Sequence, residues 1–238
     1  MKRFLLFLLS LSSLLPVAGQ AGWRLTWTAP DTVSARRTLG RPTARDVFAA
    51  MPDSLMPLLS AKARRDMLDF LDHRIAPKAL NRFGEYTVID TLTDEYLRLS
   101  LGGRSTMQLR LLDTVDSTTV LCLIHSVGRS LRDSRVVFYD EAFHRLNWLE
   151  IPRPASARFF PDDVSAGLDP TEERTLGFIC RALDDVHCIE VSAAPSNPLF
   201  TLTLSLRPLS EEERPLAMRL LRTVGYRWTG SGFEPFDP

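Results

Sequence analysis

Three side chains that often do chemistry stand close together in LCLIHSVGRS, residues 121–130: a thiol (Cys122), an imidazole (His125) and a hydroxyl (Ser126). A thiol or hydroxyl next to an imidazole is the pairing used in nucleophilic catalysis. On a β-strand, however, neighbouring side chains alternate between the two faces, so Cys122 and Ser126 would face away from His125. No glycine stands two residues before Ser126, as the G-x-S-x-G motif of hydrolases requires. We therefore expect a covered central strand here and no catalytic residue.

The remaining metal-ligand residue types do not have ligand spacing. His187 and Cys188 are adjacent, Cys180 lies on the apolar stripe of a predicted helix, and neither C-x-x-C nor H-E-x-x-H occurs. A metal site needs ligands that cluster in type and spacing. We predict no metal site and no cofactor. The three cysteines are interpreted mainly as small apolar core residues, and a Cys180–Cys188 disulfide is the open alternative.

One stretch combines aromatic and arginine side chains, which are enriched at the energetic centres of protein interfaces. It is WLEIPRPASARFF, and the candidate partner-binding residues in it are Trp148, Arg153, Arg158, Phe159 and Phe160. The alternative interpretation is that these aromatic residues anchor a proline-rich connection onto the core.

The first residues have the pattern of a secretory signal peptide. Lys2 and Arg3 precede an apolar run from residue 4 to 17, and small residues follow it. We expect cleavage after Gly19, with cleavage after Ala21 as the alternative. No cysteine follows the apolar run, which argues against a lipoprotein. The expectation is an exported protein of the periplasm or cell surface, with no transmembrane segment in the mature chain.

The charge balance bears on the kind of partner. The chain has 29 basic and 29 acidic residues, and loss of Lys2 and Arg3 with the signal peptide leaves an excess of two acids. Binding to a phosphate backbone needs a basic excess or a basic stripe. We therefore expect no nucleic-acid partner.

After an irregular segment, residues 20–42, the pattern becomes helical. Thr43 and Ser60 are possible N-caps. In the second helix, AKARRDMLDFLDHRI, the apolar stripe consists of Met67, Leu68, Leu71 and Ile75, and Arg64 is placed mostly off it. Pro77 is expected to end this helix.

From residue 85 the period changes from 3.6 to 2. The segments YTVIDTL, EYLRLSLG, STMQLRLL, TTVLCLIHSV and DSRVVFYD predict five strands. The turns between them are too short for parallel crossovers, so the strands should form an antiparallel meander. The helices before it are the natural cover for its apolar face. Residues 43–151 would make up this first half.

A proline-rich connection, residues 152–170, leads to a smaller second half, residues 171–238. Asp169 predicts the start of a helix, and two strands follow it. The capping-box pattern Ser210–Glu213 predicts another helix, which Gly225 is expected to end, and the tail predicts a hairpin over Gly230 and Gly232. Segregated helices and strands indicate an α+β fold.

The segment ARDVFAAMPDSLMPLLSAKARRDMLDFLD, residues 44–72, resembles the N-terminal signature of an uncharacterised family of exported proteins from Gram-negative gut-type anaerobes. LTDEYLRLSL, STMQLRLL and YRWTGSGFEP are similar to later blocks of that family. The resemblance implies an exported α+β protein of unknown function and supplies no catalytic residues.

These patterns favour a non-enzymatic envelope protein that binds a protein or peptide through an exposed sheet face or edge. The alternative is a hydrolase or carbohydrate-active protein whose site is assembled from distant residues.

Overall fold

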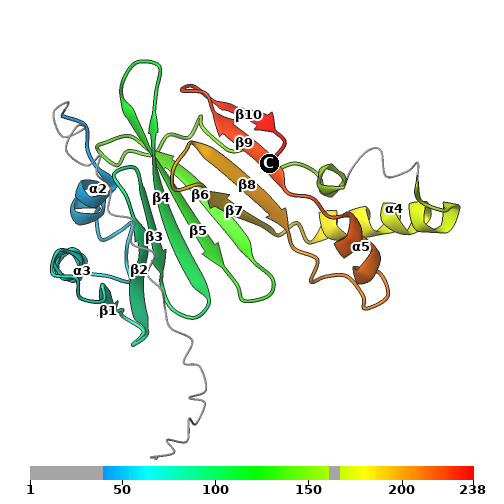
Figure 1. Ribbon diagram of the computed structural model, residues 1–238, viewed down its shortest axis with the longest axis horizontal. Coiled ribbons are helices and arrows are strands. Elements are labelled where there is room, and N and C mark those ends of the chain that lie inside the picture. The colour runs from blue at the N-terminus through cyan, green and yellow to red at the C-terminus, as the bar shows by residue number, and fades with distance from the viewer. Residues whose placement is uncertain (1–39, 161–166) are drawn as a thin grey trace, which may run out of the picture.

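The computed structural model describes residues 40–160 and 167–238 (Figure 1). The predicted signal peptide and residues 20–39 of the irregular segment lie outside the described residues. So do residues 161–166 of the proline-rich connection.

The first half is built on a six-stranded antiparallel sheet with the strand order β1-β2-β3-β4-β5-β6. Its strands are β1 (Lys78–Leu80), β2 (Tyr86–Leu92), β3 (Tyr96–Ser100), β4 (Ser105–Asp113), β5 (Thr119–Val127) and β6 (Asp133–Tyr139). The five predicted strands are β2 to β6. β1 was missed because three residues are too few to show an alternation of apolar and polar side chains.

Two helices cover one face of this sheet, α2 (Ala44–Ala50) and α3 (Ala61–Asp72). Thr43 caps α2 in a capping box with Asp46, and Ser60 caps α3, as predicted. Helix α3 ends at Asp72, before Pro77. Ile75, expected on the buried stripe, is therefore exposed.

The placement of Arg64 off the buried stripe was wrong. Its side chain is 1% exposed, and its guanidinium group donates to the Leu59 carbonyl at 2.8 Å, to the Met51 carbonyl and to Asp53 at 2.9 Å. Arg64 lies three and four residues before the buried Met67 and Leu68, so the helical period itself places it inward. The guanidinium group thus supplies hydrogen-bond donors to backbone carbonyls in the segment before α3.

The second half has the predicted order of helix, two strands, helix and hairpin. Its elements are α4 (Pro170–Asp185), β7 (Ile189–Ala193), β8 (Leu199–Leu204), α5 (Arg214–Leu220), β9 (Val224–Trp228) and β10 (Phe233–Phe236). A short 3-10 helix, η2 (Ser156–Phe159), precedes them. The strands form an antiparallel sheet with the order β10-β9-β8-β7.

Two details of this half differ from the predictions. The hydrogen bonds of the Ser210–Glu213 capping box form, but they close a turn before α5, which begins at Arg214. Gly225 does not end this helix, because it lies inside β9 opposite Phe236. A Cβ on Gly225 would come within 2.6 Å of the Phe236 ring and 2.7 Å of its carbonyl oxygen, so close strand packing explains this glycine.

The two halves share a core. The face of the large sheet that α2 and α3 leave uncovered packs against the small sheet, η2, α4 and α5, which lie on the opposite side from α2 and α3 (Figure 1). Strand β5 shows both environments: Cys122 and Ile124 belong to the core with the second half, and Leu121 and Leu123 to the core with α2 and α3. β5 is therefore a central strand covered on both faces, as predicted.

Candidate functional sites

Polar side chains of the large sheet bind the edge of β7. Amides of alternate residues along β7 each donate a hydrogen bond: Ile189 to Asp133 Oδ1 at 3.1 Å, Val191 to Ser134 Oγ at 2.9 Å, and Ala193 to Gln108 Oε1 at 3.0 Å. Alternate amides of a strand point to the same edge. This edge of β7 is therefore occupied by the protein's own side chains.

This arrangement explains the polar residues in LCLIHSVGRS. The hydroxyl of Ser126 is 2.7 Å from that of Ser134, so it supports the group that accepts the Val191 amide. Cys122 is fully buried, and burial raises the pKa of its thiol. Burial, together with Arg135, lowers the pKa of His125, which lies on the other face. The three side chains serve the packing of the strand, and the structure does not bring the thiol and the imidazole together.

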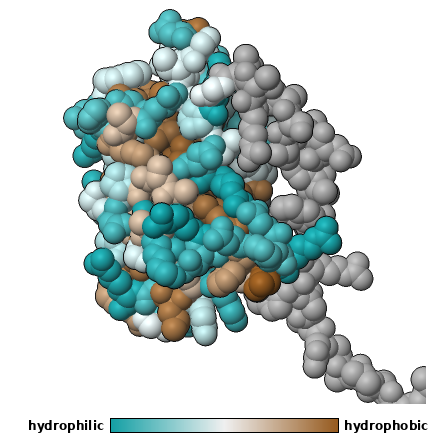
Figure 2. Space-filling model, turned by 90° about the vertical axis from the view of Figure 1, so that its left-hand side faces the viewer, coloured by the Kyte–Doolittle hydropathy of each residue, from teal (hydrophilic) through white to brown (hydrophobic). Residues whose placement is uncertain are grey.

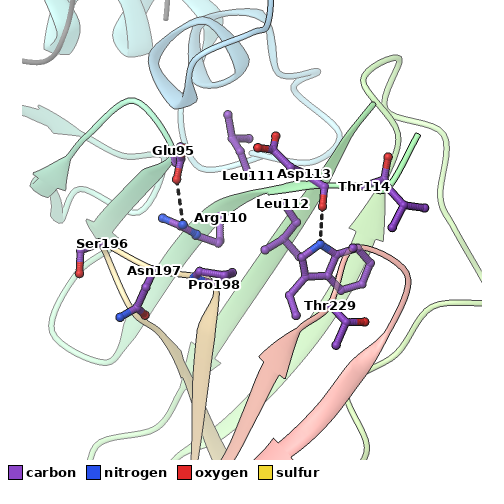
Figure 3. A pocket seen from close by; sticks show the side chains of 13 residues that line it. Glu95, Arg110, Leu111, Leu112, Asp113, Thr114, Ser196, Asn197, Pro198 and Thr229 are labelled. Carbon is purple, nitrogen blue, oxygen red and sulfur yellow. Dashed lines mark hydrogen bonds and ion pairs between the residues drawn. The ribbon is translucent and has the colours of Figure 1, made fainter. Parts of the chain in front are cut away.

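A cleft of about 500 Å³ opens where the end of β4 meets the β7–β8 loop and the β9–β10 turn (Figure 3). Arg110 lies at its base, donating to Glu95 Oε2 at 2.9 Å and to the Pro195 carbonyl at 3.0 Å. Its rim carries polar residues, namely Ser196, Asn197 and Thr229. The guanidinium group of Arg110 joins the β2–β3 turn to the β7–β8 loop and so links the two halves.

The second carboxylate of this cleft is also paired. Asp113 forms an ion pair with Arg41 at 2.8 Å, and its carbonyl accepts a hydrogen bond from Trp228 Nε1 at 2.6 Å. Glu95 and Asp113 are thus each held by an arginine, and they do not pair with each other across the cleft. The cleft is a polar seam between the halves that is open to solvent.

Cys122, Cys180 and Cys188 are all free thiols, so the alternative of a Cys180–Cys188 disulfide does not hold in this structure. Within residues 40–160 and 167–238, no group of three or more His, Cys, Asp or Glu side chains is placed to hold a metal ion. In the same residues, no helix has both the length and the apolar character needed to cross a membrane.

The predicted partner-binding residues divide into two groups. Phe159 and Phe160 are buried in the shared core, which matches the alternative interpretation that they anchor the connection. Trp148 is 68% exposed, and Arg153 and Arg158 are also exposed. Only these three of the five are therefore accessible to a partner, and their role in binding stays a prediction.

A second surface was not predicted from the sequence. The hairpin of β1 and β2 carries three exposed apolar side chains: Leu80 at 61%, Phe83 at 80% and Tyr86 at 54% exposure. Leu80 and Tyr86 are opposite each other across the strand pair, on the face away from α2 and α3. We call these three residues, with the cations Arg74, Lys78 and Arg82 that stand near them in the sequence, the hairpin patch. Figure 2 looks onto the side of the molecule where α2 and α3 lie, and apolar residues lie among hydrophilic ones there.

Buried Asn81 gives the turn of the hairpin patch a defined conformation. Its side-chain oxygen accepts from the amides of Phe83 at 2.9 Å and Glu85 at 3.1 Å, and its amide nitrogen donates to the Leu101 carbonyl at 3.0 Å. Gly84 takes a φ of 76°, which favours glycine. Phe83 is therefore presented to solvent by a hydrogen-bonded turn.

The sequence held a signal for this surface that periodicity did not reveal. Residues 73–86, HRIAPKALNRFGEY, mix apolar and basic residues around the turn-forming pair Asn81 and Gly84. Because the flanking strand β1 was too short to be recognised, the apolar residues could not be assigned to an exposed face. The exposure of Phe83 depends on the position of its turn at the end of the sheet, and the sequence pattern does not give that position.

Comparison with known proteins places the fold in a family. Residues 38–233 match the family described as "Protein of unknown function (DUF3256)". The chain belongs to this family. The uncharacterised family predicted from residues 44–72 is thereby confirmed.

A solved structure has a similar fold, described as a domain of an uncharacterized protein from Porphyromonas gingivalis W83. It is 20% identical to this chain, covers 82% of this chain and 98% of its own, and superimposes with a TM-score of 0.64. At this identity, the likeness concerns the fold alone. No curated protein matches the chain.

Proposed function

We propose that this DUF3256 protein is an exported, non-enzymatic component of the cell envelope, and that it binds a protein or peptide partner through the hairpin patch. The observation that carries the proposal is Phe83, a large apolar side chain that is 80% exposed on a turn held by Asn81. Large exposed apolar groups that gather together mark interaction sites. A turn that already has its bound conformation loses less entropy on binding.

The composition of the patch also fits a protein interface. Tyr, Phe and Arg are residue types enriched at interface centres, and the patch contains all three types, with Tyr86, Phe83 and two arginines. Leu80 extends the apolar surface beside Tyr86. Trp148, with Arg153 and Arg158, remains a second candidate contact on the connection after β6.

Site-specific crosslinking tests this proposal. A photoreactive phenylalanine analogue replaces Phe83 in the full chain, within cells that make the protein naturally. We expect a discrete crosslinked protein adduct, whose yield falls when Leu80→Ser or Tyr86→Ser is added. The matched control places the analogue at Phe178, a phenylalanine on α4 that is 59% exposed and lies against Arg181. Equal crosslinking at both positions, or none at position 83, would refute the hairpin patch as the binding site.

Export is tested separately. The proposal expects the protein in the envelope fraction, with a mature N-terminus at Gln20, or at Gly22 if cleavage follows Ala21. Cell fractionation with N-terminal sequencing measures both. Recovery in the cytoplasm with the first 19 residues still attached would contradict export, whatever the crosslinking result.

A further inference from the structure

The charges of the hairpin patch are unbalanced in a chain whose formal net charge is zero. Residues 73–86 contain Arg74, Lys78 and Arg82 but only one acid, Glu85. All four side chains are exposed. Among the residues that the structure describes, neither Arg74 nor Arg82 forms an ion pair, whereas other surface arginines such as Arg45 do. The patch therefore carries a positive charge that is not compensated locally.

Lys78 lies against one of the apolar side chains, and Arg82 adjoins another in the sequence. The Lys78 ammonium group is 4.8 Å from the centre of the Tyr86 ring, and Arg82 directly precedes Phe83. The Arg82 amide donates to the Leu58 carbonyl at 3.2 Å, which ties the turn to the segment before α3. The surface thus presents apolar groups and positive charges together on a backbone that is held in place.

We propose that the occupant of the hairpin patch is an acidic segment of a protein partner, in which carboxylates alternate with large apolar side chains. This inference rests on the proposed function and names the chemistry of its partner. The carboxylates pair with Arg74, Lys78 and Arg82, and the apolar side chains pack on Phe83 and Tyr86. Opposite charges across an interface favour the right partner and speed encounter.

The acid within the hairpin segment favours a protein over an anionic lipid surface. Glu85 is exposed between Arg82 and Tyr86 in the sequence. A lipid surface presents negative charge uniformly and would meet Glu85 as well as the cations, whereas a protein segment can place each carboxylate against a cation.

Peptide display on the purified mature chain, residues 20–238, tests the inference. Random peptides are selected on the wild-type protein, and their binding is measured on the triple variant Arg74→Glu, Lys78→Glu, Arg82→Glu. We expect the selected peptides to combine Asp or Glu with aromatic or aliphatic residues. Their affinity should fall by about tenfold or more on the triple variant, because three exposed ion pairs are lost.

The matched control reverses three exposed arginines elsewhere, Arg129, Arg174 and Arg181, and should leave the affinity unchanged. Selected peptides without acidic residues, or equal loss of affinity with this control triple, would overturn the inference. If Phe83→Ser still weakened the binding of the selected peptides in either case, the proposed function would stand although the inference had failed. If no selected peptide were affected by Phe83→Ser, both would fail.

A vesicle assay addresses the lipid alternative. The mature chain is sedimented with vesicles of phosphatidylcholine and with vesicles that also contain phosphatidylglycerol. We expect no sedimentation that depends on the three cations. Cosedimentation with the anionic vesicles that the triple variant abolishes would replace the protein partner with a membrane surface.

Discussion

The hydroxyl of Ser134 on β6 accepts a hydrogen bond from the amide of Val191 on β7 at 2.9 Å, and so joins the two sheets of the protein. Both groups are buried, where an unsatisfied amide is costly. We expect Ser134→Ala to lower the free energy of unfolding by about 1–3 kcal/mol. Urea denaturation measures this change. The control is Ser130→Ala at an exposed turn, and an equal effect of both substitutions would contradict the role given to Ser134.

Buried Arg64 provides a second test. Replacing it with methionine keeps an apolar stem of similar reach but leaves the carbonyls of Met51 and Leu59 without their donor. The expected loss of stability is about 2–4 kcal/mol, since each buried unsatisfied group is costly. Arg65→Met, on the exposed side of the same helix, should change stability by less than about 0.5 kcal/mol. Thermal and urea unfolding of the two variants should therefore differ, and similar results would refute the buried role of Arg64.

The pH dependence of stability should include a contribution from His125. Burial first, and Arg135 second, lower its pKa in the folded state below the ordinary value of 6.5. The unfolded chain then binds a proton at a higher pH than the folded chain, so stability falls as the pH decreases below about 6.5. His125→Gln should lose less stability than the wild type between about pH 7.5 and pH 5.5. An equal loss in both proteins, measured by urea unfolding, would contradict the lowered pKa.

Gly225 tests the packing of the hairpin at the C-terminus. A methyl group there would meet the ring and carbonyl of Phe236 at 2.6 and 2.7 Å. Gly225→Ala should therefore cost about 1–3 kcal/mol, because β10 must shift to accommodate it. Gly103→Ala is the control, since no atom lies within 4 Å of the Cβ position there. A cost for Gly103→Ala as large as that for Gly225→Ala would argue against the close approach.

Several parts of the fold were predictable because they depend on local patterns. The strand alternation of residues 86–139 specified β2 to β6, and the caps Thr43, Ser60 and Asp169 marked the starts of their helices. The opposite orientation of Cys122 and His125 also followed from the strand period alone. Errors arose where an element was short, as at β1, where the helical period was misinterpreted, as at Arg64, and where strand packing required a glycine, as at Gly225.

The binding surfaces depended on long-range contacts. Periodicity could not show that Ser134 and Gln108 meet the edge of β7, because these partners are 57 and 85 residues away from Val191 and Ala193 along the chain. It could not distinguish buried Phe159 from exposed Trp148, since both are aromatic residues of one irregular segment.

The amino-acid sequence by itself determined which segments are helices and strands, the α+β class and the membership of a family, because these follow from local spacing of residue types. Only the tertiary structure decided that the second sheet packs on one face of the first, and that the β1–β2 turn stays outside both cores. The physical reason is that burial depends on which faces meet, and a turn such as the one carrying Phe83 becomes a surface only when no other element packs on it.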